Sequence, residues 1–229
     1  MVQCATNRVR VVILISGRGT NMQALVRAVQ DEHLPVEIVA VLSNRADAGG
    51  LAWAQTQGLQ TQVLSHRDHD SRTAFDAALQ ARLSELAPDF ILLAGFMRVL
   101  GPELTHHFAG RIINIHPSLL PAFPGLHTHA QALAQGVQWH GCSVHFVTPI
   151  LDHGPIIAQG VIPVLANDTP DTLAARLLPV EHAIYAQVLR WLAQGSIRLL
   201  ADGRVEIPGQ PHRAWLETGL YPQEHHELT

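Results

Sequence analysis

The chain has 229 residues, of which 47% are hydrophobic and 15% charged, and its formal net charge is -4. This length suits one well-buried α/β domain, and the acidic balance without a basic run argues against a nucleic-acid-binding surface. The two cysteines, Cys4 and Cys142, exclude a disulfide scaffold and a four-thiolate zinc site. The first apolar run, 11–15, is too short for a signal peptide or a membrane span, so we expect a cytoplasmic protein that contacts no membrane.

Strands and helices alternate through the first half of the chain. Short apolar runs rich in β-branched residues predict strands at 11–15, 36–42, 61–64, 90–94 and 112–115. Apolar residues at helical spacing predict helices at 21–30, 48–57, 71–86 and 102–108. Such alternation predicts a parallel sheet with helices on both of its faces.

The pattern changes in the second half. A loop rich in Pro and Leu over 118–125 leads to a short helix at 128–134. Two strand-like runs, 142–148 and 156–164, then flank a turn that contains Asp152. These two runs predict a hairpin that extends the sheet.

The C-terminal part begins with one long helix. Asp168 or Thr169 can cap its N-terminus, and Gly195 ends it. Residues 196–229 contain short β-like runs, then prolines and a polar end, which predict a hairpin and a loosely held tail. We therefore expect one α/β domain over the whole chain, with its core at about 9–195. Its sheet is doubly wound, mostly parallel and Rossmann-like, with a C-terminal antiparallel extension.

A candidate catalytic centre lies where the strand at 112–115 ends. Asn114 and His116 are two residues apart on an extended segment, so their side chains project from the same face, and Pro117 turns the chain into a loop. Open α/β sheets bind ligands at this edge. An imidazole can move a proton, an amide can donate to an oxyanion, and Asp152 can hold an imidazolium. The three side chains predict addition to a carbonyl, and the alternative is a polar cluster whose members satisfy one another.

A glycine-containing loop joins the first strand to the first helix. Ser16-Gly-Arg-Gly-Thr-Asn21 places backbone N–H groups at a helix N-terminus, which favours a phosphate. The loop is neither a Walker A loop nor a dinucleotide fingerprint, because Met22 occupies the place of the third glycine. The alternative is a tight turn that needs glycine only for its geometry.

Other features narrow the chemistry. The apolar segment 92–100 can wall a flat aromatic ligand or belong to the core. Ser118 lacks a nucleophile-elbow context and Cys142 lies within a predicted strand, so the better fit is direct transfer of a group between two bound molecules. The 15 histidines are scattered and show no metal-ligand spacing. We expect no functional metal, and most histidines at the surface.

Six motifs follow one another along the chain. They are Ile15-Ser-Gly-Arg-Gly-Thr-Asn21, Leu93-Ala-Gly-Phe-Met-Arg98, Asn114-Ile-His-Pro-Ser-Leu-Leu-Pro121, Pro124-Gly-Leu-His-Thr-His129, Gly141-Cys-Ser-Val-His-Phe-Val147 and Asp152-His-Gly-Pro-Ile156. This series resembles the phosphoribosylglycinamide formyltransferases, a folate-dependent family of purine synthesis, from about residue 11 to residue 185. The resemblance implies transfer of the formyl group of the cosubstrate 10-formyltetrahydrofolate to the amine of 5-phosphoribosylglycinamide.

The resemblance also implies roles for individual residues. The catalytic residues would be Asn114, His116 and Asp152. The phosphoribosylglycinamide would contact Gly19, Thr20, Asn21 and Glu181. The folate would contact Arg72, Met97, Arg98, Val99, Leu100, Asn114, Thr148, Pro149, Ile150, Leu151 and Asp152.

The implied mechanism is a direct attack of the substrate amine on the formyl carbon, through a tetrahedral intermediate and without a covalent enzyme species. Asn114 and protonated His116 would stabilise the oxyanion of this intermediate. Asp152 would hold the imidazolium and help pass a proton, through water, to the departing folate nitrogen. Positioning of the two substrates would supply much of the rate enhancement.

Three positions depart from the family pattern. Leu178 and Pro179 stand where a polar substrate contact is familiar, and Ala122 replaces a common basic residue. Because the catalytic trio is intact, the expected activity stands, with weaker contact to the ribose at Leu178.

Two relatives share the trio: the enzyme that formylates initiator methionyl-tRNA and the hydrolase of 10-formyltetrahydrofolate. The first normally carries a C-terminal RNA-binding domain, and the second an N-terminal regulatory domain. We expect neither, because the chain is acidic and only ten residues precede its first strand. A non-catalytic protein that binds a phosphate ligand or a metal would keep the loop at 17–21 but leave the trio unexplained. The expected partners are small molecules, with the chain as a monomer or a weak homodimer.

Overall fold

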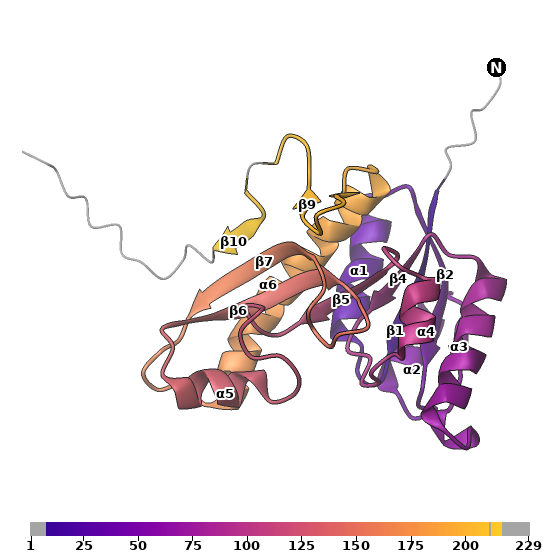
Figure 1. Ribbon diagram of the computed structural model, residues 1–229, viewed down its shortest axis with the longest axis horizontal. Helices are drawn as coiled ribbons and strands as arrows, with labels where there is room; N and C mark the ends of the chain where they lie inside the picture. Colours follow the sequence, from indigo (N-terminus) through magenta and orange to yellow (C-terminus); the bar gives the residue numbers. More distant parts are fainter. Residues whose placement is uncertain (1–7, 211, 217–229) are drawn as a thin grey trace, which may run out of the picture.

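The computed structural model describes residues 8–210 and 212–216. They form an eight-stranded sheet in the order β10-β7-β6-β5-β4-β1-β2-β3, with helices on both faces, and a separate two-stranded sheet, β8-β9 (Figure 1). The doubly wound α/β class predicted from the alternation of elements is confirmed. None of the helices within these residues is long and apolar enough to cross a bilayer.

Five neighbouring strands pair in parallel. They are β1 (Val9–Ile15), β2 (Val36–Ser43), β3 (Thr61–Val63), β4 (Phe90–Leu93) and β5 (Ile112–His116). The connecting helices are α1 (Thr20–Asp31), α2 (Gly49–Thr56), the 3-10 turn η1 (His66–Asp68), α3 (Arg72–Leu86) and α4 (Pro102–His107). Each lies within a few residues of its predicted range, except η1, which was not predicted.

The two faces of β1 build two layers of core. Val11, Ile13 and Ile15 face the side covered by α1, α2 and the long C-terminal helix α6 (Pro170–Ala193). Val12 and Leu14 face the opposite side, which α3 and α4 cover (Figure 1). Successive strand residues point to opposite faces, so a β-branched and Leu-rich run with no polar member is what a strand between two helical layers requires.

The antiparallel extension is also as predicted. β6 (Trp139–Phe146) pairs antiparallel with β5, and β7 (Ile156–Pro163) pairs antiparallel with β6. The short helix α5 (Thr128–Gln135) lies between β5 and β6 in the chain. β6 begins three residues earlier than predicted, because the pairing of Trp139 with Pro163 carries the ladder beyond the apolar run.

Helix α6 is capped as its sequence indicates. The Thr169 side chain accepts from the backbone N–H of Thr172 at 3.2 Å, and Gly195 adopts φ +62° just past the C-terminus. The buried Tyr185 hydroxyl lies 3.2 Å from the Leu93 carbonyl and 3.1 Å from the Ile113 carbonyl. The helix is thereby fixed against the ends of β4 and β5, where the predicted site lies.

The C-terminal segment is only partly as predicted. β8 (Arg198–Leu199) and β9 (Val205–Glu206) form the expected hairpin. The loose tail is wrong for β10 (Ala214–Leu216), which pairs in parallel with β7. The guanidinium of Arg213 donates to the Ile156 and Ile157 carbonyls at 3.2 and 3.3 Å, and the rest of the predicted tail, 217–229, lies outside the described residues.

Candidate active site

The fold brings the three predicted catalytic side chains together. Asn114 and His116 occupy the end of β5, opposite His145 and Ser143 of β6, and Asp152 comes from the connection between β6 and β7. Nδ1 of His116 lies 3.5 Å from Oδ2 of Asp152, and both side chains are almost fully buried. This distance is longer than a good hydrogen bond, so Asp152 lies beside the ring without a short bond to it.

Sequence reasoning missed His145, which joins the trio. Its Nδ1 lies 2.9 Å from the Phe146 carbonyl, its Nε2 lies 3.3 Å from Nδ2 of Asn114, and 3.9 Å separate Nε2 from Oδ1 of Asp152. Burial lowers the pKa of His145, although the Phe146 carbonyl and Asp152 oppose that shift. The neutral ring therefore donates from Nδ1 and accepts one N–H of Asn114 at Nε2. The second N–H of that amide remains available to a ligand.

Asp152 is held in place by the backbone around it. The backbone N–H of Gly125 donates to its Oδ2 at 2.8 Å, and the residue has φ +50°. A non-glycine residue in this region costs about 1–3 kcal/mol and persists where surrounding structure enforces it, often at functional sites. The strain and the hydrogen bond together fix the carboxylate beside His116.

The other nitrogen of His116 faces the loop that follows β5. Nε2 lies 3.0 Å from the carbonyl oxygen of Phe123, which itself has φ +54°. A carbonyl only accepts, so Nε2 carries the proton here. A second proton at Nδ1 would point at Asp152. The ring therefore has a hydrogen-bond acceptor on each side.

The predicted phosphate loop, residues 17–21, ends at the N-terminus of α1. Gly19 precedes the helix with φ +68°, and a Cβ at this position would meet the Met22 side chain at 2.9 Å. The backbone conformation therefore favours glycine here, whereas the end of the Met22 side chain could move aside. No side chain caps the helix, so its first N–H groups remain open to an anion.

Asn21, the last residue of the phosphate loop, contacts Glu181 of α6. Nδ2 of Asn21 donates to Oε2 of Glu181 at 2.7 Å, across 160 residues of sequence. Burial raises the pKa of Glu181, and the hydrogen bond from Asn21 opposes that rise. Oδ1 of Asn21 is buried and has no hydrogen-bond partner within the described residues. The structure thus joins two of the predicted substrate contacts.

Most of the predicted folate contacts lie on two segments, 97–100 and 148–152. Four of their apolar side chains are exposed by 46–69%: Met97, Val99, Ile150 and Leu151. Exposed apolar side chains beside polar catalytic groups mark a ligand-binding surface. Thr148 and Pro149 belong to the same turn as Ile150.

The remaining folate candidates differ in exposure. Leu100 is only 5% exposed and packs into the core, so its side chain offers little surface to a ligand. Arg98 is partly buried, with its guanidinium 5.8 Å from the centre of the Phe75 ring, and Arg72 is exposed at the first turn of α3. We name residues 97–100 the folate loop.

Two further histidines lie behind the trio. Nδ1 of His129 on α5 is 3.0 Å from Nε2 of His140 on β6, and His140 is 1% exposed. The prediction was that most histidines lie at the surface, and among the described histidines His116, His140 and His145 are the buried exceptions. Burial, reinforced by the neighbouring His129, lowers the pKa of His140 to about 4.

Acidification is expected to destabilise the fold through His140. The unfolded chain protonates the His140 ring near pH 6.5, whereas in the folded protein the ring stays neutral until about pH 4. Stability is therefore full above pH 6.5 and falls as the pH drops towards 4, by up to about 3 kcal/mol. Chemical denaturation at several pH values checks this in wild type and His140→Gln, with the exposed His106→Gln as the control. An equally steep loss in His140→Gln would contradict the assignment.

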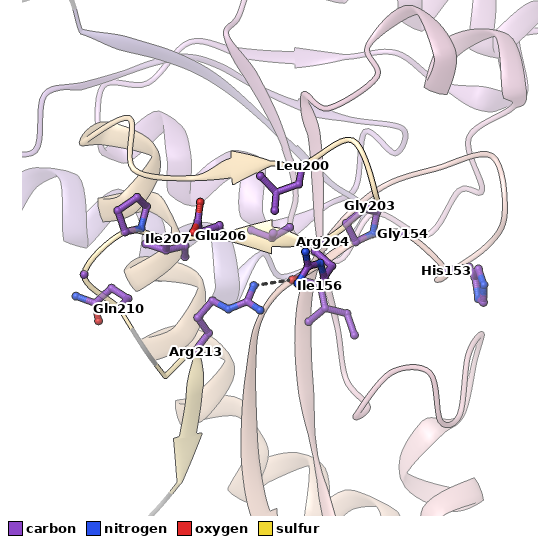
Figure 2. Close-up of a pocket in the computed structure, with 14 residues that line it drawn as sticks. His153, Gly154, Ile156, Leu200, Gly203, Arg204, Glu206, Ile207, Gln210 and Arg213 are labelled. Carbon is purple, nitrogen blue, oxygen red and sulfur yellow. Dashed lines mark hydrogen bonds between the residues drawn. The ribbon is translucent and has the colours of Figure 1, made fainter.

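A separate cavity of about 930 Å³ lies beside the β8-β9 hairpin (Figure 2). It is lined by the segment 153–156 and by residues from 200 to 213, and Arg213 spans it to reach the Ile156 carbonyl. The predicted site residues are absent from its lining. In the described parts of the chain, no group of three or more His, Cys, Asp or Glu side chains is arranged to hold a metal ion.

The comparisons with known proteins cover the segments that carry the site residues. Residues 9–189 match the formyl transferase family, a span that includes the phosphate loop, the trio and Glu181. The chain belongs to the formyl transferase family. It is 48% identical to phosphoribosylglycinamide formyltransferase of Escherichia coli (strain K12) over 93% of this chain and 96% of the relative. The resemblance read from the six motifs is confirmed.

Solved formyltransferase structures agree. Glycinamide ribonucleotide transformylase 1 from Symbiobacterium toebii superposes with a TM-score of 0.86 at 43% identity, over 90% of this chain and 97% of that one. Formyltetrahydrofolate deformylase from Burkholderia mallei superposes with a TM-score of 0.79 at 30% identity, over 88% of this chain and 70% of that one. The fold is thus shared by a transferase and a deformylase, and the choice between them depends on the site.

Proposed function

We propose that this chain transfers the formyl group of 10-formyltetrahydrofolate to the amine of 5-phosphoribosylglycinamide, giving the formylglycinamide ribonucleotide and tetrahydrofolate in de novo purine biosynthesis. The observation that carries the proposal is the grouping of Asn114, His116 and Asp152, in a chain that also presents an open helix N-terminus and an exposed apolar rim. This arrangement offers one place for a phosphorylated amine and one for a flat cosubstrate. The 48% identity to a protein named phosphoribosylglycinamide formyltransferase supports the same pairing.

The phosphorylated substrate occupies the phosphate loop. Backbone N–H groups of Gly19, Thr20 and Asn21 bind its phosphate, helped by the dipole of α1. Glu181, held by Asn21 at 2.7 Å, binds the ribosyl or glycinamide part. The substrate amine then points along α1 towards the end of β5.

The folate binds at the exposed apolar rim, which comprises the folate loop and the turn at 148–152. Met97, Val99, Ile150 and Leu151 cover its ring, the backbone at Leu100 and the turn at 148–152 contact its polar edge, and the guanidinium groups of Arg72 and Arg98 face its carboxylates. The formyl group then lies at Asn114.

The reaction is a direct transfer. The amine attacks the formyl carbon, and the free N–H of Asn114 together with the His116 imidazolium stabilises the oxyanion. The N–H at Nε2 of His116 must leave the Phe123 carbonyl before it can donate to this oxyanion. The His116 imidazolium gives a proton, by way of Asp152 and water, to the folate nitrogen as its bond to the formyl carbon breaks, and the neutral ring then takes up the proton lost by the amine.

The partners in this proposal are small molecules alone. The net charge of -4 supports the absence of a nucleic-acid partner, and the proposed setting is the cytoplasm, as a monomer or a weak homodimer.

The test is release of tetrahydrofolate, followed by absorbance, with and without 5-phosphoribosylglycinamide. The proposal predicts release only when the ribonucleotide is present, and a product whose mass has gained one formyl group. Release without it would indicate hydrolysis, the activity for which the Burkholderia mallei protein is named. No release under either condition would contradict both enzymes.

Leu178→Gln is expected to lower KM for the ribonucleotide by roughly 2- to 10-fold, with kcat little changed. Leu178 is half-buried and stands three residues before Glu181 on α6, so both side chains lie on one face of that helix. An amide there adds one hydrogen bond to the bound substrate, about 0.5–1.5 kcal/mol. Steady-state kinetics against Ala183→Gln, an exposed position of the same helix, provides the comparison. An unchanged KM in Leu178→Gln would count against a ribose contact at this position.

A further inference from the structure

One buried serine joins the phosphate loop to the folate loop. Ser16 directly follows β1, directly precedes the phosphate loop and is 7% exposed. Its hydroxyl accepts from the backbone N–H of Met97 at 2.8 Å, and its own backbone N–H donates to the Gly95 carbonyl at 3.2 Å. Ser16, the last residue before the phosphate loop, thus bonds to Met97 at the start of the folate loop and to Gly95 just before it.

The direction of these bonds is fixed by Asn44. The Ser16 hydroxyl donates its single proton to Oδ1 of Asn44 at 2.5 Å, so it can only accept from Met97. Asn44 is 3% exposed, and its Nδ2 lies 3.2 Å from Nδ1 of His66. Nδ1 of His66 also lies 3.0 Å from the Asn44 backbone carbonyl, so the ring holds Asn44 in place whichever of the two bonds it makes.

The phosphate loop is also tied at Gly17, directly after Ser16, and the folate loop is tied at its far end. The backbone N–H of Gly50 donates to the Gly17 carbonyl at 3.0 Å, which holds the phosphate loop against α2. Oδ2 of the buried Asp76 accepts from the Gly101 backbone N–H at 2.8 Å, which holds the far end of the folate loop against α3. With both loops held against helices in this way, Ser16 provides a direct hydrogen-bonded link between them.

We infer that Ser16 is a positioning residue that couples the two substrate sites. It contacts neither substrate in the proposed complex. A phosphate that orders residues 17–21 also orders Ser16, and through its hydroxyl the Met97 backbone against which the folate lies. Coupling of this kind is reciprocal, so each ligand raises the affinity for the other by the same factor. The inference rests on the proposed function, because it takes the two loops to bind those two substrates.

The test measures this factor without turnover. 5-Phosphoribosylglycinamide and the product tetrahydrofolate form a complex that has no formyl group to transfer. Titration calorimetry gives Kd for tetrahydrofolate alone and with saturating ribonucleotide. Wild type is expected to bind tetrahydrofolate about fivefold or more tightly when the ribonucleotide is bound. In Ser16→Ala this ratio is expected to fall to nearly 1.

Matched variants separate coupling from general damage. Ser43 ends β2 directly beside Ile15, is 1% exposed, and its hydroxyl accepts a local bond from the Arg45 backbone N–H. Ser43→Ala should keep the wild-type ratio. Should Ser16→Ala fail to fold, Asn44→Ala removes the hydroxyl's acceptor and is expected to lower the ratio in the same way.

The outcomes are distinct. A wild-type ratio of 1, or a ratio in folded Ser16→Ala or Asn44→Ala equal to that of wild type, overturns the inference alone. If wild type binds neither the ribonucleotide nor tetrahydrofolate, the proposed function fails and the inference fails with it.

Discussion

His116→Ala is expected to lower kcat by roughly 100- to 10,000-fold, the range typical of losing a positioned acid–base group. The imidazole lies 3.5 Å from Asp152 and 3.0 Å from the Phe123 carbonyl, so an imidazolium at this position has an acceptor on each side. Alanine removes both the proton carrier and one of two donors to the oxyanion. Asn114 would remain, which is why some activity should survive.

Steady-state kinetics with both substrates saturating checks this prediction. The control is His106→Ala, because His106 is exposed in the last turn of α4 and takes no part in the site. A folded His116→Ala enzyme with a kcat within a few-fold of wild type would remove His116 from the chemistry. Asp152→Asn keeps the shape of the carboxylate but not its charge, and should also lower kcat strongly, because an amide cannot hold the imidazolium.

Gly154→Ala is expected to have the second largest effect, on stability and activity together. A Cβ at residue 154 would collide with the backbone carbonyl of Phe146, and that carbonyl group cannot rotate away as a side-chain end could. Phe146 is also tied to the connection by its N–H, which donates to the Pro155 carbonyl at 2.9 Å. Relief requires the connection between β6 and β7 to move, and Asp152 moves with it.

The expected cost of Gly154→Ala is about 1–3 kcal/mol or more of unfolding free energy, as for other overpacked positions, with a fall in kcat of at least tenfold. Denaturant unfolding and steady-state kinetics measure the two effects. Gly49→Ala is the matched control, because a Cβ at that position meets nothing within 4 Å at the start of α2. Alanine there should be neutral or stabilising by up to about 1 kcal/mol. Equal free energies of unfolding for the two variants would show that the connection between β6 and β7 moves without cost, and would contradict the prediction.

Most of the fold was predictable from the sequence because its signals are local. The buried run of β1, the Thr169 cap of α6 and the glycine at residue 195 each act within a few residues. The catalytic trio was also accessible: Asn114 and His116 share a strand end, and Asp152 stands in a turn between two strand-like runs. What these predictions use is spacing along one element.

The missed features depend on pairing between distant segments. His145 joins the trio because the antiparallel register sets it opposite Asn114, and a one-residue shift would turn it to the other face. β10 forms because Arg213 and Trp215 meet β7 and Trp191, contacts that no local pattern in a polar tail indicates. The position of His145 would have followed from the register of β5 and β6 had it been known.

The central claim is that the trio passes the formyl group directly from the folate to the ribonucleotide. A single-turnover reaction with 10-formyltetrahydrofolate labelled in its formyl carbon, quenched at successive times, tests it most directly. The account predicts that the label moves from folate to ribonucleotide with none attached to protein at any time, and that transfer is slowed in His116→Ala. Label on the protein, or label released as formate while the ribonucleotide stays unformylated, would contradict it.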